Sequence, residues 1–333
     1  MATISDIAKA AGVSIATVSR VLSKPDVVKS ATRQRVMEVV DRMGYQPNAL
    51  AQQLRMQETK NILVIIPSME NYMAHKVIRG VEQAADANGY HTLIADMHDQ
   101  DTIEDYYMNA IQKRQADGII SLSTSMAQKL STLEGAASFP IVIALHDPDK
   151  SKIPCVTIDH SAAARAAMTH LIRLGHKKIA HITSSQKITP YLRRIDSYRE
   201  VLLETQLPFA PELIRFGESS LQSGYEMTES LLSSGNNFTA IFAAGDTMAL
   251  GAMKALKAHG IRVPQDCAVV GFDDIELAAY WDPALTTVRI PMEQLGQRAF
   301  AKLLAQIKGE PILIEKEVLP HELVIRESCG YLM

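Results

Sequence analysis

Apolar residues in the first 45 positions recur at helical spacing and predict three short helices. The first helix covers residues 4–11, where Thr3 can cap it and Asp6 stands three residues later, the spacing of a capping box. Gly12 ends this helix, because glycine readily adopts the left-handed conformation that commonly follows a helix. The pattern therefore predicts a short capped helix followed by a tight turn.

Two further helices follow this turn. Ser14 can cap a second helix over residues 15–22, and a third begins after Ser30 and ends at Gly44. The inward face of the third helix is expected to comprise Val36, Val39, Val40 and Met43. Two short helices joined by a tight turn and closed by a third match a helix-turn-helix unit, with a generic three-helix cap as the alternative.

Beyond Lys60 the pattern changes to short apolar runs that alternate with amphipathic segments. Such alternation indicates βαβ units with parallel sheets, and about eight strands exceed what one small doubly wound domain needs. We therefore expect two α/β lobes that face a cleft. The apolar runs expected to form strands are residues 61–67, 91–96, 117–122, 140–145, 155–159, 178–183, 239–244 and 267–273.

The charge of the chain is divided unevenly. Residues 1–60 hold nine Lys and Arg against five Asp and Glu, a net charge of +4, whereas the remainder carries −7 and the whole 333-residue chain −3. A basic head on an acidic body suggests a polyanionic partner for the head. With 47% hydrophobic and 21% charged residues, the composition is that of a folded protein.

The cysteines and the N-terminus indicate the compartment. Cys155, Cys267 and Cys329 are far apart and odd in number, which favours buried free thiols in a reducing cytosol. The N-terminal sequence has no charged region followed by an apolar run, and no stretch approaches the length of a membrane span. We expect a cytoplasmic protein, associated with the nucleoid, without a membrane partner.

Enzyme motifs are missing from the sequence. It contains no dinucleotide-binding or phosphate-binding glycine loop, no nucleophile elbow and no zinc-ligand pair. His176 and His181 have no second ligand pair nearby and are better explained by packing. The sequence therefore predicts neither an enzyme nor a bound cofactor or metal.

The second predicted helix carries groups suited to reading DNA. As a recognition helix it would present Ser14, Ile15, Ala16 and Thr17 to the major groove, with Arg20 one turn further along. Arginine can donate two hydrogen bonds to guanine, whereas Ile15 and Ala16 offer apolar contact to thymine methyl groups. The short hydroxyls suited to phosphate oxygens are Thr17, Ser19, Ser23 and Thr32, for which capping or solvation is the alternative role.

Residues 3–22, followed by residues 44–54, resemble the DNA-binding head and hinge of the lactose repressor family of bacterial regulators. Residues 175–182, 246–256, 263–278 and 283–288 resemble the core of that family, which is similar to periplasmic sugar-binding proteins. Within the family, residues 61–82 are most similar to the cytidine and ribose repressors. The resemblance implies an all-α helix-turn-helix head, a hinge helix and a two-lobed α/β core with parallel sheets.

That family implies a dimer, sometimes a tetramer, on a pseudo-palindromic operator in double-stranded DNA. The resemblance assigns Asn48, Ala49 and Leu54 to a hinge helix whose leucine wedges into the minor groove. We expect this helix to be frayed without DNA and ordered on an operator. The DNA-binding residues expected in all are Thr3, Ser14, Ile15, Ala16, Thr17, Ser19, Arg20, Ser23, Thr32, Tyr45, Asn48, Ala49 and Leu54.

The effector site rests on the same resemblance. Arg194 and Asp273 stand where the family binds hydroxyls or polar ring atoms of its effector, and Met73 and Asp246 are assigned to the same cleft. The cleft also departs from the family pattern. Met73 and Ala74 replace frequent aromatic residues, Gly245 a frequent asparagine, Ser219 an aromatic residue and Ile290 a glutamine. These changes predict a less polar and less aromatic cleft.

The expected domains are a head over residues 1–46, a hinge over 47–58 and a core over 59–333. Residues 293–307 read as a helix of the first lobe, so the chain is expected to cross between lobes. The first lobe then comprises about 60–159 and 291–319, and the second about 160–290 and 320–333.

The functional prediction is a DNA-binding transcriptional regulator, most simply a repressor, controlled by a small effector of the sugar or nucleoside class. The alternatives are control by a partner protein, a receptor without DNA binding, and a doubly wound enzyme.

Overall fold

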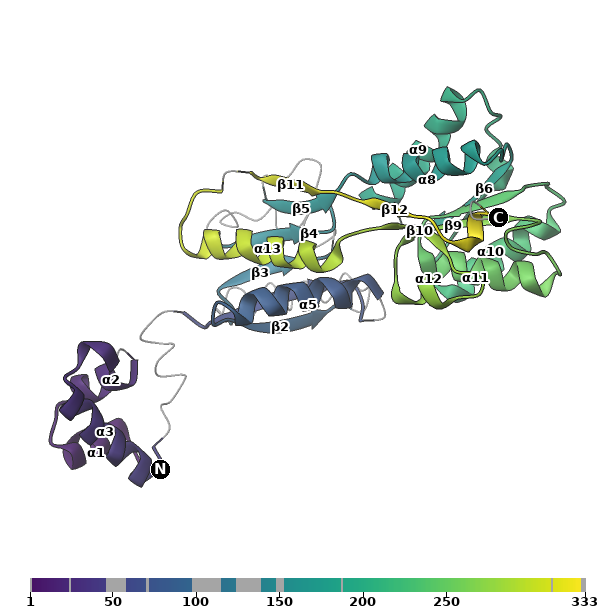
Figure 1. Cartoon of the computed structure of the whole chain (residues 1–333). Helices are drawn as coiled ribbons and strands as arrows, with labels where there is room; N and C mark the ends of the chain where they lie inside the picture. The colour runs from purple at the N-terminus through teal and green to yellow at the C-terminus, as the bar shows by residue number, and fades with distance from the viewer. Residues whose placement is uncertain are drawn as a thin grey trace. The chain divides into compact units, whose positions relative to one another are not determined.

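The computed structural model of the protein describes residues 2–23, 25–45, 58–69, 72–97, 115–123, 139–147, 153–186, 188–312 and 314–330. The chain forms two compact units, a head up to Thr59 and a core from Lys60 onward (Figure 1). The expected contacts of Asn48, Ala49 and Leu54 lie outside the described residues, as does the side chain of Ser23.

The head contains the three predicted helices, and its capping groups are those that the sequence indicates. Asp6 N–H donates to Thr3 Oγ1 over 3.3 Å, and Thr3 N–H donates to Asp6 Oδ2 over 3.0 Å, which completes the capping box. Gly12 has a φ of 63° and ends the first helix in the left-handed conformation. The helices are α1 (Ile4–Ala11), α2 (Ile15–Ser23) and α3 (Ser30–Met43), with a 3₁₀ turn over Pro25–Val27.

One inward position of the head was predicted wrongly. Val36, Val39 and Val40 are buried in the core of the head, but Met43 is 37% exposed. Gly44 turns the chain at the end of α3, and Tyr45 folds back so that its N–H donates to Val40 O over 3.1 Å. Tyr45 packs against the core of the head, whereas Met43 does not belong to it.

The first lobe of the core is built on a six-stranded, parallel sheet with the order β11-β5-β4-β3-β1-β2 (Figure 1). Helices α5 (Tyr72–Asp86) and α13 (Met292–Ile307) pack against each other, and α13 contacts β3, β4 and β5. The strands are β1 (Asn61–Ile66), β2 (His91–Asp96), β3 (Gly118–Ser121), β4 (Ile141–Ala144), β5 (Cys155–Ile158) and β11 (Lys316–Leu319).

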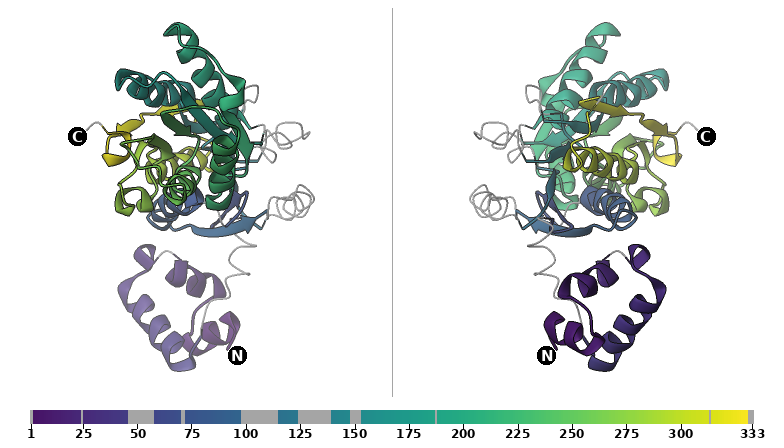
Figure 2. Two further views of the ribbon diagram at one scale, coloured as in Figure 1. Left: turned by 90° about the vertical axis from the view of Figure 1, so that its right-hand side faces the viewer. Right: turned by 90° about the vertical axis from the view of Figure 1, so that its left-hand side faces the viewer.

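The second lobe has a sheet with the order β12-β10-β9-β8-β6-β7, in which only the β10–β12 pair is antiparallel. Helices cover both faces of this sheet (Figure 2). Its strands are β6 (Ile179–Ser184), β7 (Ile214–Gly217), β8 (Ala240–Ala243), β9 (Ala268–Asp273), β10 (Thr286–Arg289) and β12 (Glu322–Val324). Its helices are α8 (His160–Arg173), α9 (Thr189–Glu204), α10 (Leu221–Ser233), α11 (Asp246–Ala258) and α12 (Glu276–Tyr280), with 3₁₀ turns over Pro211–Leu213 and Glu327–Cys329.

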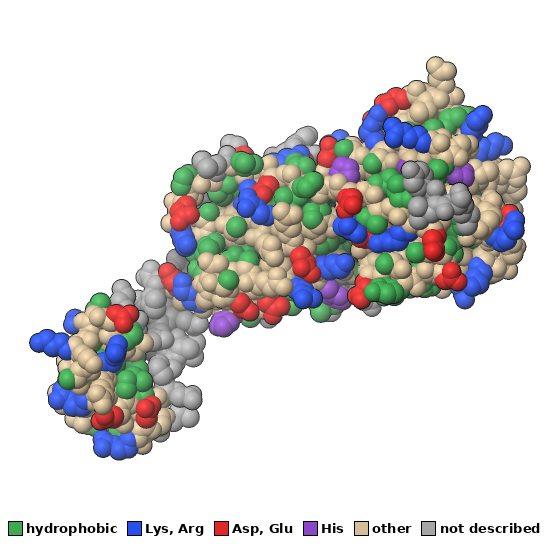
Figure 3. Space-filling model, in the orientation of Figure 1, with side chains coloured by type: hydrophobic (Ala, Val, Ile, Leu, Met, Phe, Trp, Pro, Cys, Tyr) green, Lys and Arg blue, Asp and Glu red, His purple; other side chains and the backbone are tan. Residues whose placement is uncertain are grey.

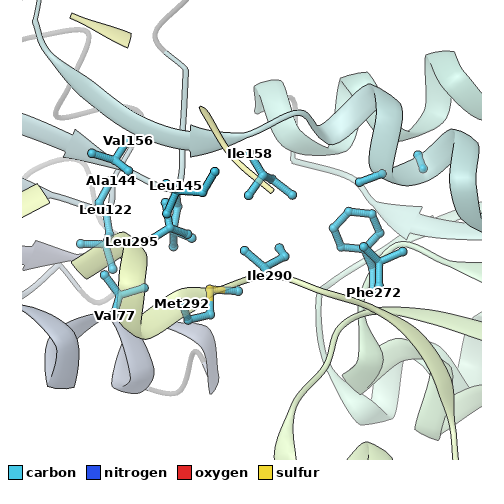
Figure 4. Close-up of a cluster of buried hydrophobic side chains, with 14 of the residues drawn as sticks. Val77, Leu122, Ala144, Leu145, Val156, Ile158, Phe272, Ile290, Met292 and Leu295 are labelled. Atoms are coloured by element: carbon cyan, nitrogen blue, oxygen red, sulfur yellow. The ribbon is translucent and has the colours of Figure 1, made fainter. Parts of the chain in front are cut away.

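The chain passes three times between the lobes, from β5 to α8, from β10 to α13 and from β11 to β12. Ile158 and Ile290 lie on two of these crossings, between Leu145 of the first lobe and Phe272 of the second (Figure 4). All four side chains belong to one cluster of buried apolar residues. Burial of apolar surface therefore continues along the connections as well as inside each lobe.

Glycine allows two helix pairs to pack at very short distances. A Cβ on Gly80 of α5 would lie 2.0 Å from Glu293 O, and a Cβ on Gly296 of α13 would lie 2.1 Å from Val77 O. In the second lobe, α10 and α11 repeat this arrangement through Gly224 and Gly251. The backbones touch at these points, so no larger residue fits without separating the helices.

His181 is a fully buried histidine in the middle of the second lobe. Its ring stacks between Tyr198, with a centroid distance of 5.0 Å, and Phe242, with a centroid distance of 4.9 Å. Its Nδ1 lies 2.8 Å from Phe242 O and therefore carries the proton. Burial lowers the pKa of this imidazole from 6.5 to about 4, and the positive charges of Arg194 and Arg199 lower it to a smaller extent.

This burial makes the stability of the core dependent on pH. Because the folded pKa is below the unfolded one, the unfolded state binds the extra proton, and stability is lost as the pH falls from 6.5 towards 4. The wild type and His181→Phe are both unfolded at pH 7 and at pH 5, and the decrease in unfolding free energy between these pH values is compared. We expect this decrease to be about 2 kcal/mol smaller in His181→Phe than in the wild type. Urea unfolding at the two pH values measures this difference. An unchanged difference would contradict the neutral, buried state of the ring.

Candidate functional sites

A cavity of about 360 Å³ lies between the two lobes and is lined by residues of both. The first lobe contributes Leu122, Leu145 and His146, which follow strands β3 and β4. The second lobe contributes Asp273, at the end of β9, and Arg194, on α9. Parallel strands bring their carboxyl ends to one edge of a sheet, so the two sheets direct these side chains towards a common space.

Arg194 is a buried cation at the wall of this cavity. Its guanidinium lies 3.7 Å from the ring centroid of Phe272, and its Nη1 donates to Ala244 O. Its Nη2 lies 3.7 Å from Asp273 Oδ1 and 3.5 Å from His160 Nδ1. Burial lowers the pKa of Arg194, whereas Asp273 raises it. The side chain is therefore fixed in place by packing and by charge.

Asp273 is presented to the cavity by a strained turn. Asp273 and Asp274 have φ values of 115° and 56°, a region that non-glycine residues rarely occupy. Asp274 is held by two guanidinium groups, since Arg289 Nε and Arg326 Nη2 each donate to its carboxylate over 2.7 Å. Lys76 Nζ, on α5 of the first lobe, donates to Asp274 O over 3.4 Å and so connects the turn to that lobe. These contacts stabilise a conformation that the backbone would otherwise disfavour.

Asp246 was expected to bind an effector, and the structure places it elsewhere. Its carboxylate is fully buried and does not line the cavity. It accepts hydrogen bonds from Thr287 Oγ1 over 2.5 Å and from Ile275 N–H over 2.9 Å. Burial raises the pKa of Asp246, and the negative charge of Asp273 raises it further. Asp246 thus supports the turn that carries Asp273, because protein donors already occupy both of its oxygens.

Two histidines at the cavity were not among the residues expected from the sequence. His146 follows β4 and is 8% exposed, and His160 begins α8 and is 7% exposed. His146 Nε2 lies 2.8 Å from Leu122 O, and His160 Nε2 lies 3.2 Å from Leu145 O. Burial lowers the pKa of both imidazoles, to about 4 for His146. Both follow apolar runs predicted to be strands, and this position was the signal that could have identified them.

The apolar wall of the cavity includes several of the positions where the sequence departs from the family pattern. Met73, Ala74, Ser219 and Ile290 all line it. The cavity is nevertheless more aromatic than the sequence suggested, because Tyr72 and Tyr191 line it as well. Tyr191 is 7% exposed and lies 5.4 Å from the Arg194 guanidinium, measured to the ring centroid.

A second, more open cavity of about 920 Å³ lies on the second lobe and includes Trp281, which does not line the space between the lobes. All three cysteines are buried free thiols, as the sequence suggested. Among the described residues, no group of three or more His, Cys, Asp or Glu is arranged to hold a metal ion. In the same residues, no helix has the length and apolar character needed to cross a membrane.

The head presents the expected DNA-reading side chains at its surface. On α2, Ile15 is 50% exposed, and Ala16 and Arg20 are exposed as well. Ser14 caps this helix, because Thr17 N–H donates to Ser14 Oγ over 3.2 Å. Lys and Arg side chains are spread over the visible face of the head (Figure 3). Thr3 is engaged in the capping box, Ser19 and Thr32 are half-buried, and Tyr45 packs on the core of the head.

A helix-turn-helix head joined to a two-lobed α/β core with a cavity between its lobes defines a ligand-responsive DNA-binding regulator. Residues 3–48 match the model of the lacI family of bacterial regulatory proteins, and residues 168–329 match the periplasmic binding protein-like domain. The HTH-type transcriptional repressor CytR of Escherichia coli strain K12 is 34% identical over 327 residues, which cover 98% of this chain and 96% of that protein.

Solved structures give the same result. The lac repressor dimer bound to operator and the anti-inducer ONPF aligns with a TM-score of 0.88 and 29% identity, over 98% of this chain and 99% of that one. A complex of the transcriptional regulator CelR with cellobiose aligns with a TM-score of 0.75 and 29% identity, over 98% of this chain and all of that one.

The chain therefore belongs to the lacI family of bacterial regulatory proteins. It is a DNA-binding transcriptional regulator and not an enzyme, and the fold class predicted from the sequence is confirmed.

Proposed function

We propose that the protein is a cytoplasmic repressor that binds a pseudo-palindromic operator as a homodimer. A small effector of the sugar or nucleoside class binds between the lobes and changes the affinity of the heads for DNA. The observation that carries the proposal is the buried pair of Arg194 and Asp273 at the wall of a cavity lined by both lobes. Coupling between two such sites is typically about 1 to 3 kcal/mol and acts equally in both directions.

The cavity supports a ligand with both apolar and polar faces. Met73, Ile290 and Tyr191 offer apolar surface, while Arg194 and Asp273 offer a donor and an acceptor. The CelR complex with cellobiose shows that a protein of the same fold binds a sugar. The proposal is tested by titrating the protein on operator DNA with sugars and nucleosides. Operator affinity that responds to none of them, while the protein still binds operator, would contradict effector control.

Exposed apolar side chains support a homodimer. On the edge strand β2, Leu93 is 41% exposed and Ile94 is 47% exposed. On the second lobe, Leu221, Leu277 and Tyr280 are exposed at 40%, 39% and 82%. Contiguous exposed apolar surface marks sites of association, and Leu93 with Ile94, and Leu277 with Tyr280, are close in the chain. The lac repressor similarity supports the same assembly, because that structure is a dimer bound to its operator.

Replacing Arg20 with alanine should weaken binding to a matched operator by about 1 to 3 kcal/mol, because a guanine would lose a bidentate hydrogen bond. The measurement is fluorescence anisotropy with a duplex that the protein selects from a randomised pool. A random duplex of the same length is titrated in parallel, and its affinity should change much less.

Lys9→Ala is the matched control for this experiment. Lys9 is exposed on α1, and its replacement removes the same unit of charge. A charge that acts only through phosphates should lower the affinity for both duplexes by similar amounts. If Arg20→Ala also weakens both duplexes equally, Arg20 contacts phosphate and does not read a base.

A further inference from the structure

The second cavity, of about 920 Å³, lies at the opposite end of helix α11 from the space between the lobes. Thr247, in the first turn of α11, lines the space between the lobes, whereas Met253 and Lys257, further along, line the second cavity. In the part of the chain that the structure describes, no residue lines both. Small-molecule sites typically measure about 300 to 1,000 Å³, so the second cavity has the size of a separate ligand site.

One part of the lining of this cavity is apolar and continuous with the core of the second lobe. Met253 is 3% exposed and belongs to the core cluster, and Val263 and Trp281 pack against that cluster while remaining half-buried. Pro264 and Pro283 line the cavity as well. Burying apolar surface contributes about 25 cal/mol per Å², and an aromatic ring packed beside Trp281 contributes further through ring contacts. This part of the cavity therefore suits a flat apolar group.

Two lysines of the lining have no partner among the described residues. Lys254 and Lys257 are three residues apart on α11, so their side chains leave the same side of the helix. Both are exposed, and neither forms a hydrogen bond or ion pair with a described residue. The helix does not need them as caps, because the N–H groups of His259, Gly260 and Ile261 donate to the carbonyls of its last turn. Their charge is therefore available to an anion in the cavity.

The remaining charges of the lining leave this pair of lysines uncompensated. Arg262 donates to the carboxylate of Asp266 from Nε over 2.7 Å and from Nη2 over 2.8 Å, so these two charges are paired with each other. Glu327 Oε2 accepts a hydrogen bond from Ala284 N–H over 2.8 Å. Asp282 is exposed, and in the described chain neither Asp282 nor Glu327 forms an ion pair with the two lysines. The side of the cavity formed by α11 is thus positive.

We propose that this cavity is a second ligand site, distinct from the effector cavity, and that it binds a small carboxylate with an aromatic ring. The ring packs beside Met253 and Trp281, and the carboxylate lies against Lys254 and Lys257. Because the two cavities share no lining residue among those described, a ligand in one leaves the contacts of the other unchanged. Exposed ion pairs are weak, so each lysine should contribute no more than about 5-fold in affinity.

The test uses the full-length protein and four probes that separate the ring from the charge. Phenylacetate has both, phenylacetamide is its neutral isostere, phenethylamine carries the opposite charge, and acetate lacks the ring. Trp281 is the only tryptophan of the chain, so its fluorescence reports on this cavity alone. We expect phenylacetate to change the emission of Trp281 and to protect it from quenching by acrylamide. Calorimetric titration should give weaker binding for phenylacetamide, and the weakest for phenethylamine and acetate.

Lys254→Gln/Lys257→Gln should weaken phenylacetate binding by about 5-fold or more, and increasing salt should weaken binding to the wild type in the same direction. Lys177→Gln/Lys178→Gln is the matched control, because it removes the same charge from two exposed residues of the second lobe that lie outside the cavity. Its affinity should change by less than about 2-fold. Lys254→Glu/Lys257→Glu should reverse the order of the probes, so that phenethylamine binds more tightly than phenylacetate. All these positions are exposed, and melting temperatures verify that each variant folds.

Several results would overturn the proposal. Equal binding of phenylacetate and phenylacetamide would show a site without charge selection, and equal weakening in the two lysine pairs would show that only the net charge of the protein matters. Calorimetric binding that leaves the emission of Trp281 unchanged would place the probe elsewhere. A Trp281 that acrylamide cannot reach in the unliganded protein would show that a second subunit closes the cavity. Absence of binding by phenylacetate would refute the site directly, and none of these results bears on operator binding or on the effector cavity.

Discussion

Replacing Arg194 with alanine should abolish effector binding and lower the unfolding free energy by about 3 to 5 kcal/mol. Arg194 is 2% exposed and is the cation beside the buried carboxylate of Asp273. Its loss leaves that carboxylate buried without a counter-charge and removes the cation from the face of Phe272. Urea unfolding measures the stability, and calorimetric titration measures the effector.

The charge and the volume of Arg194 can be separated with two further variants. Arg194→Met keeps most of the volume but removes the charge, so it should remain strongly destabilised. Adding Asp273→Asn removes the stranded carboxylate as well and should recover much of the stability, because a buried pair can often be replaced by neutral groups without loss. Effector binding should not return in the double variant. A loss of less than about 1 kcal/mol in Arg194→Met at pH 8, above the pKa of Asp273, would contradict a strong charge pairing.

The pH dependence provides an independent check on this pair. Burial raises the pKa of Asp273 from 3.8 to about 7, while Arg194 lowers it. A carboxyl whose folded pKa is raised binds its proton more tightly when folded, so its ionisation reduces stability as the pH rises from 3.8 to the folded pKa. Without Arg194 the folded pKa rises further. Arg194→Met should therefore lose more stability than the wild type between pH 6 and pH 8.

Gly296→Ala should lower the unfolding free energy by about 2 kcal/mol or more, although alanine is the better helix former by about 1 kcal/mol. The added Cβ would lie 2.1 Å from Val77 O and 2.8 Å from Val81 N, both on the backbone of α5. A backbone cannot move aside as a flexible side chain does, so α13 and α5 must separate and lose packing along their whole contact. Urea unfolding of the purified protein measures the effect.

Ala301→Gly, on an exposed site of the same helix, is the matched control. It should lower the unfolding free energy by about 1 kcal/mol through helix propensity alone. Gly296→Ala instead gains helix propensity and loses packing, so the two variants separate these effects. Gly80→Ala adds a Cβ to the same contact, 2.0 Å from Glu293 O. Once the helices have separated, the second alanine should cost less than the first, so the double variant should be less destabilised than the sum. A stabilised Gly296→Ala would show that the helices are not in such close contact.

Local sequence predicted the head in detail, because its interactions join residues close in the chain. The capping box of Thr3 and Asp6 and the left-handed turns at Gly12 and Gly44 depend on groups three to five residues apart. Met43 was the exception. It lies in the last turn of α3, where helical periodicity alone does not show whether other parts of the head cover the side chain.

In the described part of the core, the eight expected strands were found and four further strands were missed. Strands β7, β10, β11 and β12 are three or four residues long and contain charged or polar side chains, so they show no apolar run. Three of these four lie at sheet edges, where one side of the strand has no neighbour to require an apolar pattern. Pairing with distant strands defines them, as in the register of Lys316 with Cys155.

The sequence by itself predicted the helix-turn-helix head and the alternation that forms two parallel sheets, because these follow from periodicity, caps and turn signals within short segments. The class of the protein followed from the resemblance of its motifs to the lactose repressor family. Only the tertiary structure decided the roles of polar residues at the strand ends. In the sequence Asp246 and Asp273 are equivalent, each an acid next to a buried strand. The contacts of Asp246 with Thr287 and Ile275, 41 and 29 residues away, make it a support for the turn, whereas Asp273 and His146 line the cavity between the lobes. Hydrogen-bond satisfaction in a buried site depends on groups from several elements, and no local pattern contains that information.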